Sequence, residues 1–248
     1  MNPQTYLPTT GRILVQLRAD RRTVGLIMGV PAALLTLLYF VYSEQPGGEA
    51  LFNRVAISMM AILPMLVMFL VTSVAMLRER SSGTLERLWT TPLHRADLLL
   101  GYATAFTLTA VGQSLILCAV AAWALDVTIA SSWGWVVLTA LLDAFVGVAT
   151  GLVTSAFARS EFQAVQFMPV VISPQIFLCG LLVPREELPR GLELVGNVLP
   201  MTWANDAVGE LASSADLSGG FWRNLLWLTI LGIVVLLLAS RTTPRRSR

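Results

Sequence analysis

Six long apolar segments dominate the chain. An apolar helix needs about 20 residues to cross the roughly 30 Å hydrocarbon core of a bilayer, and each segment reaches that length. The segments are continuously apolar and do not alternate with a period of two, which favours helices over the strands of a membrane barrel. The pattern therefore predicts an all-α integral membrane protein with six transmembrane helices, over residues 23–42, 55–77, 97–125, 133–158, 162–183 and 221–240.

The composition agrees with this prediction and limits the possible functions. Hydrophobic residues make up 55% of the 248-residue chain and charged residues only 13%, whereas soluble globular domains carry about 25% charged residues. A water-soluble protein is therefore excluded. All 17 basic residues are arginines, and a P-loop requires a lysine to reach the nucleotide phosphates. We therefore expect no ATP hydrolysis by this chain, and we identify no catalytic, cofactor-binding or metal-binding residues.

The arginines are distributed unevenly among the segments that join the spans. If the N-terminus is cytoplasmic, 13 of the 17 arginines fall in cytoplasmic segments. Positively charged residues collect on the cytoplasmic side of membrane proteins, so we expect both termini to be cytoplasmic. The first 22 residues contain no continuous apolar stretch followed by a cleavage site, and we expect no removable signal peptide. The four remaining arginines, expected outside, are Arg54, Arg185, Arg190 and Arg223.

Residues 9–22 predict a short helix before the first span. Thr9 or Thr10 can cap its N-terminus, and Ile13, Leu14 and Leu17 cluster on one side with charged residues on the other. A helix of this kind lies in the plane of the membrane interface. The alternative is a plain basic flank that only sets the topology.

The outer segment, residues 184–220, is too apolar to extend freely into water. Apolar residues recur at helical spacing up to Leu199, where Pro200 breaks the pattern. A second short helix is expected from Trp203 towards Leu211. Neither piece is long enough to span a bilayer, so we expect re-entrant or interfacial helices that cap the outer end of the protein.

The cytoplasmic loop, residues 78–95, is longer than a simple turn requires. Gly83 stands at a helix start, and Glu86 follows three residues later, where an acid favours a helix N-terminus. Leu85, Leu88 and Trp89 then share one face of a single short helix. Apolar side chains presented to the cytoplasm indicate a docking surface. The alternative is a solvated connector whose leucine and tryptophan side chains contact lipid headgroups.

Asp143 is the one acid deep inside a predicted span. A charged side chain at the bilayer centre costs about 2.5–3.5 kcal/mol on insertion scales, so it should face protein or water. It is either a proton or substrate site, or a structural group that pairs with Gln113, Ser114 or a backbone group. We favour the structural role because no second intramembrane ionisable group offers a relay. An intramembrane enzyme that uses Asp143 and His94 is disfavoured because the two residues lie at different depths.

Gly147 and Gly151 lie one turn apart in the same predicted span as Asp143. With neighbouring small residues they give the helix a smooth face. Small residues allow membrane helices to approach closely, so we expect this face to pack tightly against another helix.

Residues 79–93 resemble the type-2 permease family of ABC transporters. Members of that family show a Glu-Arg-x-x-Gly-Thr-Leu-Glu stretch and then Thr-Pro-Leu before the third span. The outer sequences CGLLVPREELP and VLPMTWANDAV are also similar to the family pattern, in the form closest to daunorubicin-resistance-type drug exporters. The resemblance runs from about residue 12 to residue 240. The matching loop residues are Glu79, Arg80, Gly83, Thr84, Leu85, Glu86, Thr91, Pro92 and Leu93.

The resemblance implies a single exporter transmembrane domain over residues 1–248, in the cytoplasmic membrane of a bacterium. It implies a dimer with a second permease copy or a homologous permease, and a separate cytosolic ABC ATPase that binds ATP and magnesium. The family does not fix the substrate, and the leading hypothesis is a hydrophobic drug or lipid-like compound. Membrane lipids are expected among the partners, and no nucleic acid is expected. Lipid or polysaccharide export, and a non-transporting subunit that anchors or regulates an ATPase, remain the alternatives.

The resemblance also assigns the loop to ATPase coupling. Glu79 and Glu86 are expected to pair with basic groups of the ATPase, and Arg80 and Arg87 with acidic ones. The expected coupling residues are Glu79, Arg80, Gly83, Thr84, Leu85, Glu86, Arg87, Leu88 and Trp89.

Overall fold

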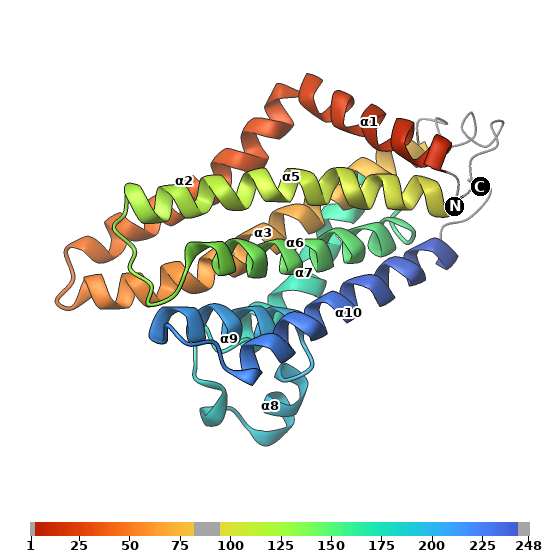
Figure 1. Cartoon of the computed structure of the whole chain (residues 1–248). Coiled ribbons are helices and arrows are strands. Elements are labelled where there is room, and N and C mark those ends of the chain that lie inside the picture. The colour runs from red at the N-terminus through yellow and green to blue at the C-terminus, as the bar shows by residue number, and fades with distance from the viewer. Residues whose placement is uncertain (1–2, 82–94, 243–248) are drawn as a thin grey trace.

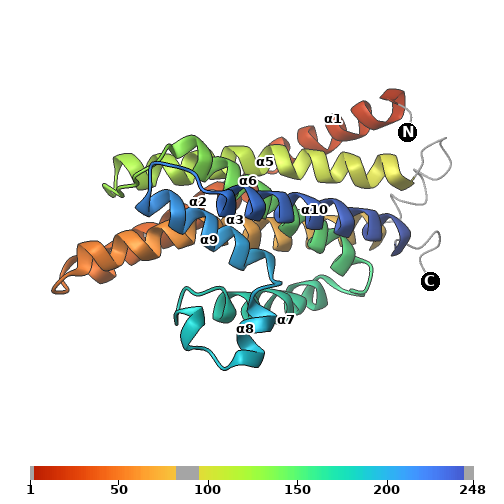
Figure 2. The same cartoon turned by 60° about the horizontal axis from the view of Figure 1, so that its bottom comes forward.

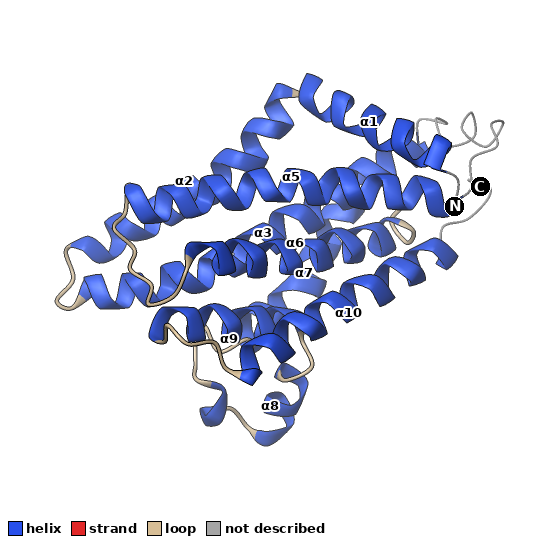
Figure 3. Ribbon diagram, in the orientation of Figure 1, coloured by secondary structure: helices blue, strands red, loops and turns tan. Residues whose placement is uncertain are grey.

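A computed structural model describes residues 3–81 and 95–242, and every regular element in these two ranges is a helix (Figures 1 and 3). Nine of the elements are α-helices and one is a short 3-10 helix. They are α1 (Pro3–Ala19), α2 (Arg21–Ser43), α3 (Gly48–Ser81), α5 (Arg95–Trp123), α6 (Trp133–Ser155), α7 (Glu161–Leu178), η1 (Arg185–Glu187), α8 (Arg190–Gly196), α9 (Pro200–Ser213) and α10 (Gly219–Thr242).

The long helices run alongside one another as an elongated bundle (Figure 1). We call one end of the bundle the termini end: there α1 begins, α3 ends, α5 begins and α10 ends. The opposite end, where α2 turns back into α3, is the hairpin end. Figure 2 shows the same arrangement from a second direction, with α8 set apart from the bundle beside α7.

Five helices are long and apolar enough to cross a bilayer, namely α2, α3, α5, α6 and α10. The all-helical membrane architecture expected from the sequence is thus confirmed. The remaining predicted span, residues 162–183, corresponds to α7, which has 18 residues and ends at Leu178. Gly180 follows with a φ of 90°, a left-handed conformation that favours glycine and ends helices. Six spans therefore remain a prediction.

The centre of the bundle is the contact between α3 and α6. A Cβ atom added at Gly147 would lie 2.4 Å from the Met65 carbonyl oxygen, and one added at Gly151 would lie 2.6 Å from that of Phe69. The two glycines therefore let the backbones of α3 and α6 touch, which is the close packing expected from the sequence.

The N-terminal segment differs from the expected helix over residues 9–22. Helix α1 begins at Pro3, so Thr9 and Thr10 lie inside the helix and do not cap it. The Thr10 hydroxyl donates instead to the Tyr6 carbonyl, one turn back. The helix ends at Ala19, because Asp20 caps the next helix: its carboxylate accepts from the Thr23 backbone N–H at 3.1 Å.

Candidate functional site

The last turn of α3 is bound to three other helices. Arg78 forms a bidentate pair with Glu161 of α7, with two nitrogen–oxygen distances of 2.9 Å. Glu79 forms an ion pair with Arg12 of α1 at 3.3 Å. The Arg80 guanidinium donates to the backbone carbonyl of Ser155, the last residue of α6. We call Arg78, Glu79 and Arg80 the loop stem, because they lie just before residues 82–94.

The three contacts of the loop stem differ in strength. The Arg78 and Glu161 side chains are 58% and 51% exposed, so water screens their pair, although the Arg78 hydrogen bonds still lower the pKa of Glu161. The Glu79 side chain is only 11% exposed, so its pair with Arg12 is less screened. Arg80 places a positive charge on the unpaired carbonyls at the C-terminus of α6, where the helix dipole favours it.

A groove opens beside the loop stem at the termini end. Its volume is about 680 Å³, and its walls come from α1, α2, α3 and α5. Asp20, Arg78 and Glu79 supply charged groups on its surface. The rest of the surface is largely apolar, including Leu17, Ile27, Val30, Leu70, Val71, Val74 and Phe106.

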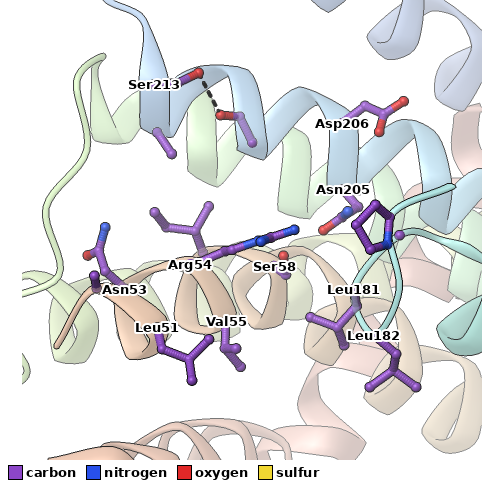
Figure 4. Close-up of a pocket in the computed structure, with 16 residues that line it drawn as sticks. Leu51, Asn53, Arg54, Val55, Ser58, Leu181, Leu182, Asn205, Asp206 and Ser213 are labelled. Atoms are coloured by element: carbon purple, nitrogen blue, oxygen red, sulfur yellow. Dashed lines mark hydrogen bonds between the residues drawn. The ribbon is translucent and has the colours of Figure 1, made fainter. Parts of the chain in front are cut away.

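A second cavity, of about 650 Å³, lies at the hairpin end (Figure 4). The first turns of α3 form one part of its lining, from Ala50 to Ser58. The turn after α7 forms another, from Gly180 to Pro184, and α9 closes it from Asn205 to Ser213. We call this space the hairpin-end cavity. Helix α3 therefore lines both this cavity and the groove at the termini end.

Arg185 fixes the turn after α7 against α9. One guanidinium nitrogen donates to both carboxylate oxygens of Asp206, at 2.8 and 2.7 Å, and another donates to the Asn197 side chain at 2.8 Å. The Asn205 amide donates to the Cys179 carbonyl at 3.0 Å. Burial raises the pKa of Asp206, and the neighbouring Arg185 acts against that rise. These bonds hold the polar wall of the hairpin-end cavity in place.

Residues 184–220 fold as two short α-helices and one 3-10 turn, in agreement with the short helices expected from the sequence. Pro200 begins α9, and the side chains of Met201, Ala204, Val208 and Leu211 are fully buried. Helix α9 thus packs into the bundle with one apolar face. The described part of this segment contains no helix long enough to span a bilayer.

Comparison with known proteins places the chain in a family. Residues 5–211 match the sequence profile described as "ABC-2 type transporter". The chain belongs to this family. It is 29% identical over 170 residues to "Probable multidrug ABC transporter permease YbhR" of Escherichia coli K12, a match that covers 68% of this chain and 46% of the relative.

Two further relatives agree with this assignment. "Probable multidrug ABC transporter permease YbhS" of Escherichia coli K12 is 24% identical over 203 residues, which cover 79% of this ABC-2 chain and 54% of the relative. "ABC transporter G family member 20" of Dictyostelium discoideum is 30% identical over 141 residues, or 57% of this chain and 19% of the relative. The chain spans about half the length of the bacterial relatives that it matches.

The structure describes only two of the expected coupling residues of this ABC-2 chain. Glu79 and Arg80 were expected to meet charged groups of an ATPase, but they bind Arg12 and Ser155 of their own chain, because the last turn of α3 lies among α1, α6 and α7. No local sequence pattern indicated those partners, and the pairing of Glu79 and Arg80 with an ATPase stays a prediction. The other coupling residues, Gly83, Thr84, Leu85, Glu86, Arg87, Leu88 and Trp89, lie outside the described residues, as does His94.

Asp143 of α6 is fully buried. The hydrogen bonds expected with Gln113 and Ser114 are not formed: neither Asp143 oxygen has a partner in the described chain, and the side-chain polar atoms of Gln113 and Ser114 have none either. Thr139, one turn away, donates to the Trp135 carbonyl instead. The described residues therefore do not show Asp143 as a structural group held by hydrogen bonds. A proton or substrate role for Asp143 remains a proposal.

Proposed function

We propose that this ABC-2 chain is the permease subunit of an ATP-driven exporter that moves hydrophobic drugs or lipid-like compounds out of the cell. The observation that carries the proposal is the loop stem, where the segment expected to dock an ATPase is anchored to α1, α6 and α7. A displacement of the loop would act on three helices at once. ATP and magnesium would be bound by the separate ATPase, and a second permease copy or a homologue would complete the transporter.

Helix α3 supplies the mechanical link in this proposal. It carries the loop stem at one end and lines the hairpin-end cavity at the other, and the groove lies between α3 and its neighbours. ATPase movement transmitted through the stem would therefore reach both spaces through one helix. The apolar walls of the groove favour a hydrophobic substrate over a polysaccharide, because sugars would leave their hydroxyl groups unpaired there.

The proposed orientation places the termini end in the cytoplasm. Single cysteines at Ser82 and Ser213, in a background that lacks Cys118 and Cys179, should then be labelled from opposite sides of the membrane. A membrane-impermeant maleimide should label Ser213→Cys in intact cells and Ser82→Cys only after lysis. Labelling of both positions in intact cells would show that the orientation is wrong.

The loop itself provides the test of the proposed function. Truncating a buried apolar anchor of an interface commonly costs about 2 kcal/mol, roughly thirtyfold in affinity. We therefore expect Leu85→Ala and Glu86→Arg to abolish co-purification of the partner ATPase or to uncouple its hydrolysis from transport. The membrane domain should still elute as a folded species in size-exclusion chromatography.

The matched control is Trp133→Ala at the start of α6, on the opposite side of the membrane, which should leave ATPase binding intact. A non-transporting anchor subunit would also lose the ATPase in the loop variants. It would differ from an exporter because the unmodified chain would transport no substrate in reconstituted vesicles. Full ATPase binding and transport in both loop variants would identify the loop as a simple connector.

A further inference from the structure

The hairpin-end cavity has one positively charged residue in its lining, Arg54, which is exposed. Arg54 is the only basic residue in its lining, and among the described residues no acidic side chain forms an ion pair with it. Among the described lining residues Asp206 is the only acid, and Arg185, which lies outside the lining, already binds both of its oxygens. The cavity therefore presents the Arg54 guanidinium as its free charged group.

The lining is mostly apolar on one side of Arg54 and more polar on the other. Figure 4 shows Leu51, Val55, Leu181 and Leu182 below the Arg54 side chain, and Asp206 and Ser213 above it. Asn205 lies beside the end of the Arg54 side chain, and Ser58 lies just below it. Leu51 and Leu182 are 45% and 58% exposed, so part of the apolar side is open to a ligand. The Arg54 side chain extends along the boundary between the two sides.

We infer that the hairpin-end cavity binds an amphiphile with a single anionic group, such as a carboxylate or phosphate, and an apolar chain. The guanidinium of Arg54 offers paired N–H donors that match both oxyanions bidentately. Leu51, Val55 and Leu182 would contact the apolar chain. A volume of about 650 Å³ falls within the range of small-molecule sites.

The position of the cavity agrees with this ligand class. Arg54 directly precedes the second predicted span, residues 55–77, where an arginine lies at the level of the lipid headgroups. An anionic lipid and a free amphiphilic compound share the required chemistry. Binding at this site does not depend on an ATPase, so the inference is separate from the proposed transport function.

The test uses the full chain in nanodiscs of phosphatidylcholine. A fatty acid that carries a photoactivatable diazirine is the probe, and its methyl ester is the neutral control. The acid should crosslink to the lining peptides at a lower concentration than the ester does. A hydrogen bond to a charged group contributes enough for Arg54→Gln to weaken labelling by the acid about tenfold, with little change for the ester.

Two variants make the result specific. Arg54→Lys keeps the charge and should retain labelling by the acid within about threefold, and Arg190→Gln removes an exposed arginine outside the lining and should change nothing. Addition of phosphatidylglycerol should suppress labelling if the ligand is a lipid headgroup and leave it unchanged if the ligand is a free amphiphile. Equal labelling by acid and ester, or unchanged labelling in folded Arg54→Gln, would overturn the inference.

Discussion

Gly147→Ala should strongly destabilise the protein. The new Cβ atom would lie 2.4 Å from the Met65 backbone oxygen, and a backbone atom cannot move aside as a side chain can. Overpacking in a well-packed interior costs about 1–3 kcal/mol, and a clash with backbone belongs at the upper end of that range. For a chain of this size about 3 kcal/mol corresponds to a fall in Tm of roughly 6–12 °C. The fall in Tm can be measured by thermal unfolding in detergent, with the folded fraction monitored by size-exclusion chromatography.

Gly29→Ala is the matched control for this change. Gly29 also lies in an apolar membrane helix, α2, but a Cβ atom there would meet no heavy atom within 4 Å. Alanine also has a higher helix propensity than glycine, so Tm should stay constant or rise slightly. Equal Tm values for Gly147→Ala and the unmodified chain would show that α3 and α6 can separate without cost.

Glu79→Arg should break the loop stem. The Glu79 side chain is only 11% exposed and lies beside Arg12 and near the buried Tyr102. An arginine at this position would place two cations side by side. Leaving a largely buried charge without its partner costs about 3–5 kcal/mol. We expect loss of substrate-stimulated ATPase activity and a lower Tm, both measured on the reconstituted complex.

The charge swap separates the ion pair from other effects of the substitution. Arg12→Glu combined with Glu79→Arg restores opposite charges at the two positions, and should recover more than half of the lost stability. Arg18→Glu is the control, because Arg18 lies in the same helix but is exposed and forms no ion pair among the described residues. A double variant as unstable as Glu79→Arg alone would show that the pair itself contributes nothing.

The features that depend on local pattern were predictable. The apolar segments indicated the membrane helices, and Gly147 and Gly151 indicated a close helix contact, because both follow from spacing along one helix. The end of α7 was misplaced because apolar length suggested a span to residue 183, while the left-handed conformation of Gly180 ends the helix earlier. Thr9 or Thr10 was expected to cap the N-terminal helix, but that helix begins before both residues, at Pro3.

The candidate sites depended on contacts that no local pattern encodes. Arg78 and its partner Glu161 are 83 residues apart, and the partners of Glu79 and Arg80 lie in two further helices. Glu79 and Arg80 were expected to pair with charged groups of an ATPase, which stays a prediction, whereas their contacts within the chain were not expected. The hairpin-end cavity likewise joins residues of α3 and α9, which only the tertiary fold brings together.

The order of synthesis determines when the contacts of the loop stem can form. Because Glu161 follows Arg78 by 83 residues, a ribosome that adds roughly 5–20 residues per second makes it about 4–17 s later. Until then α3 and the following loop exist in the membrane without their tie to α7. If residues 82–94 bind an ATPase, as proposed, the nascent chain has this segment before the contact between Arg78 and Glu161 can form, so firm ATPase attachment is expected to follow synthesis of α7.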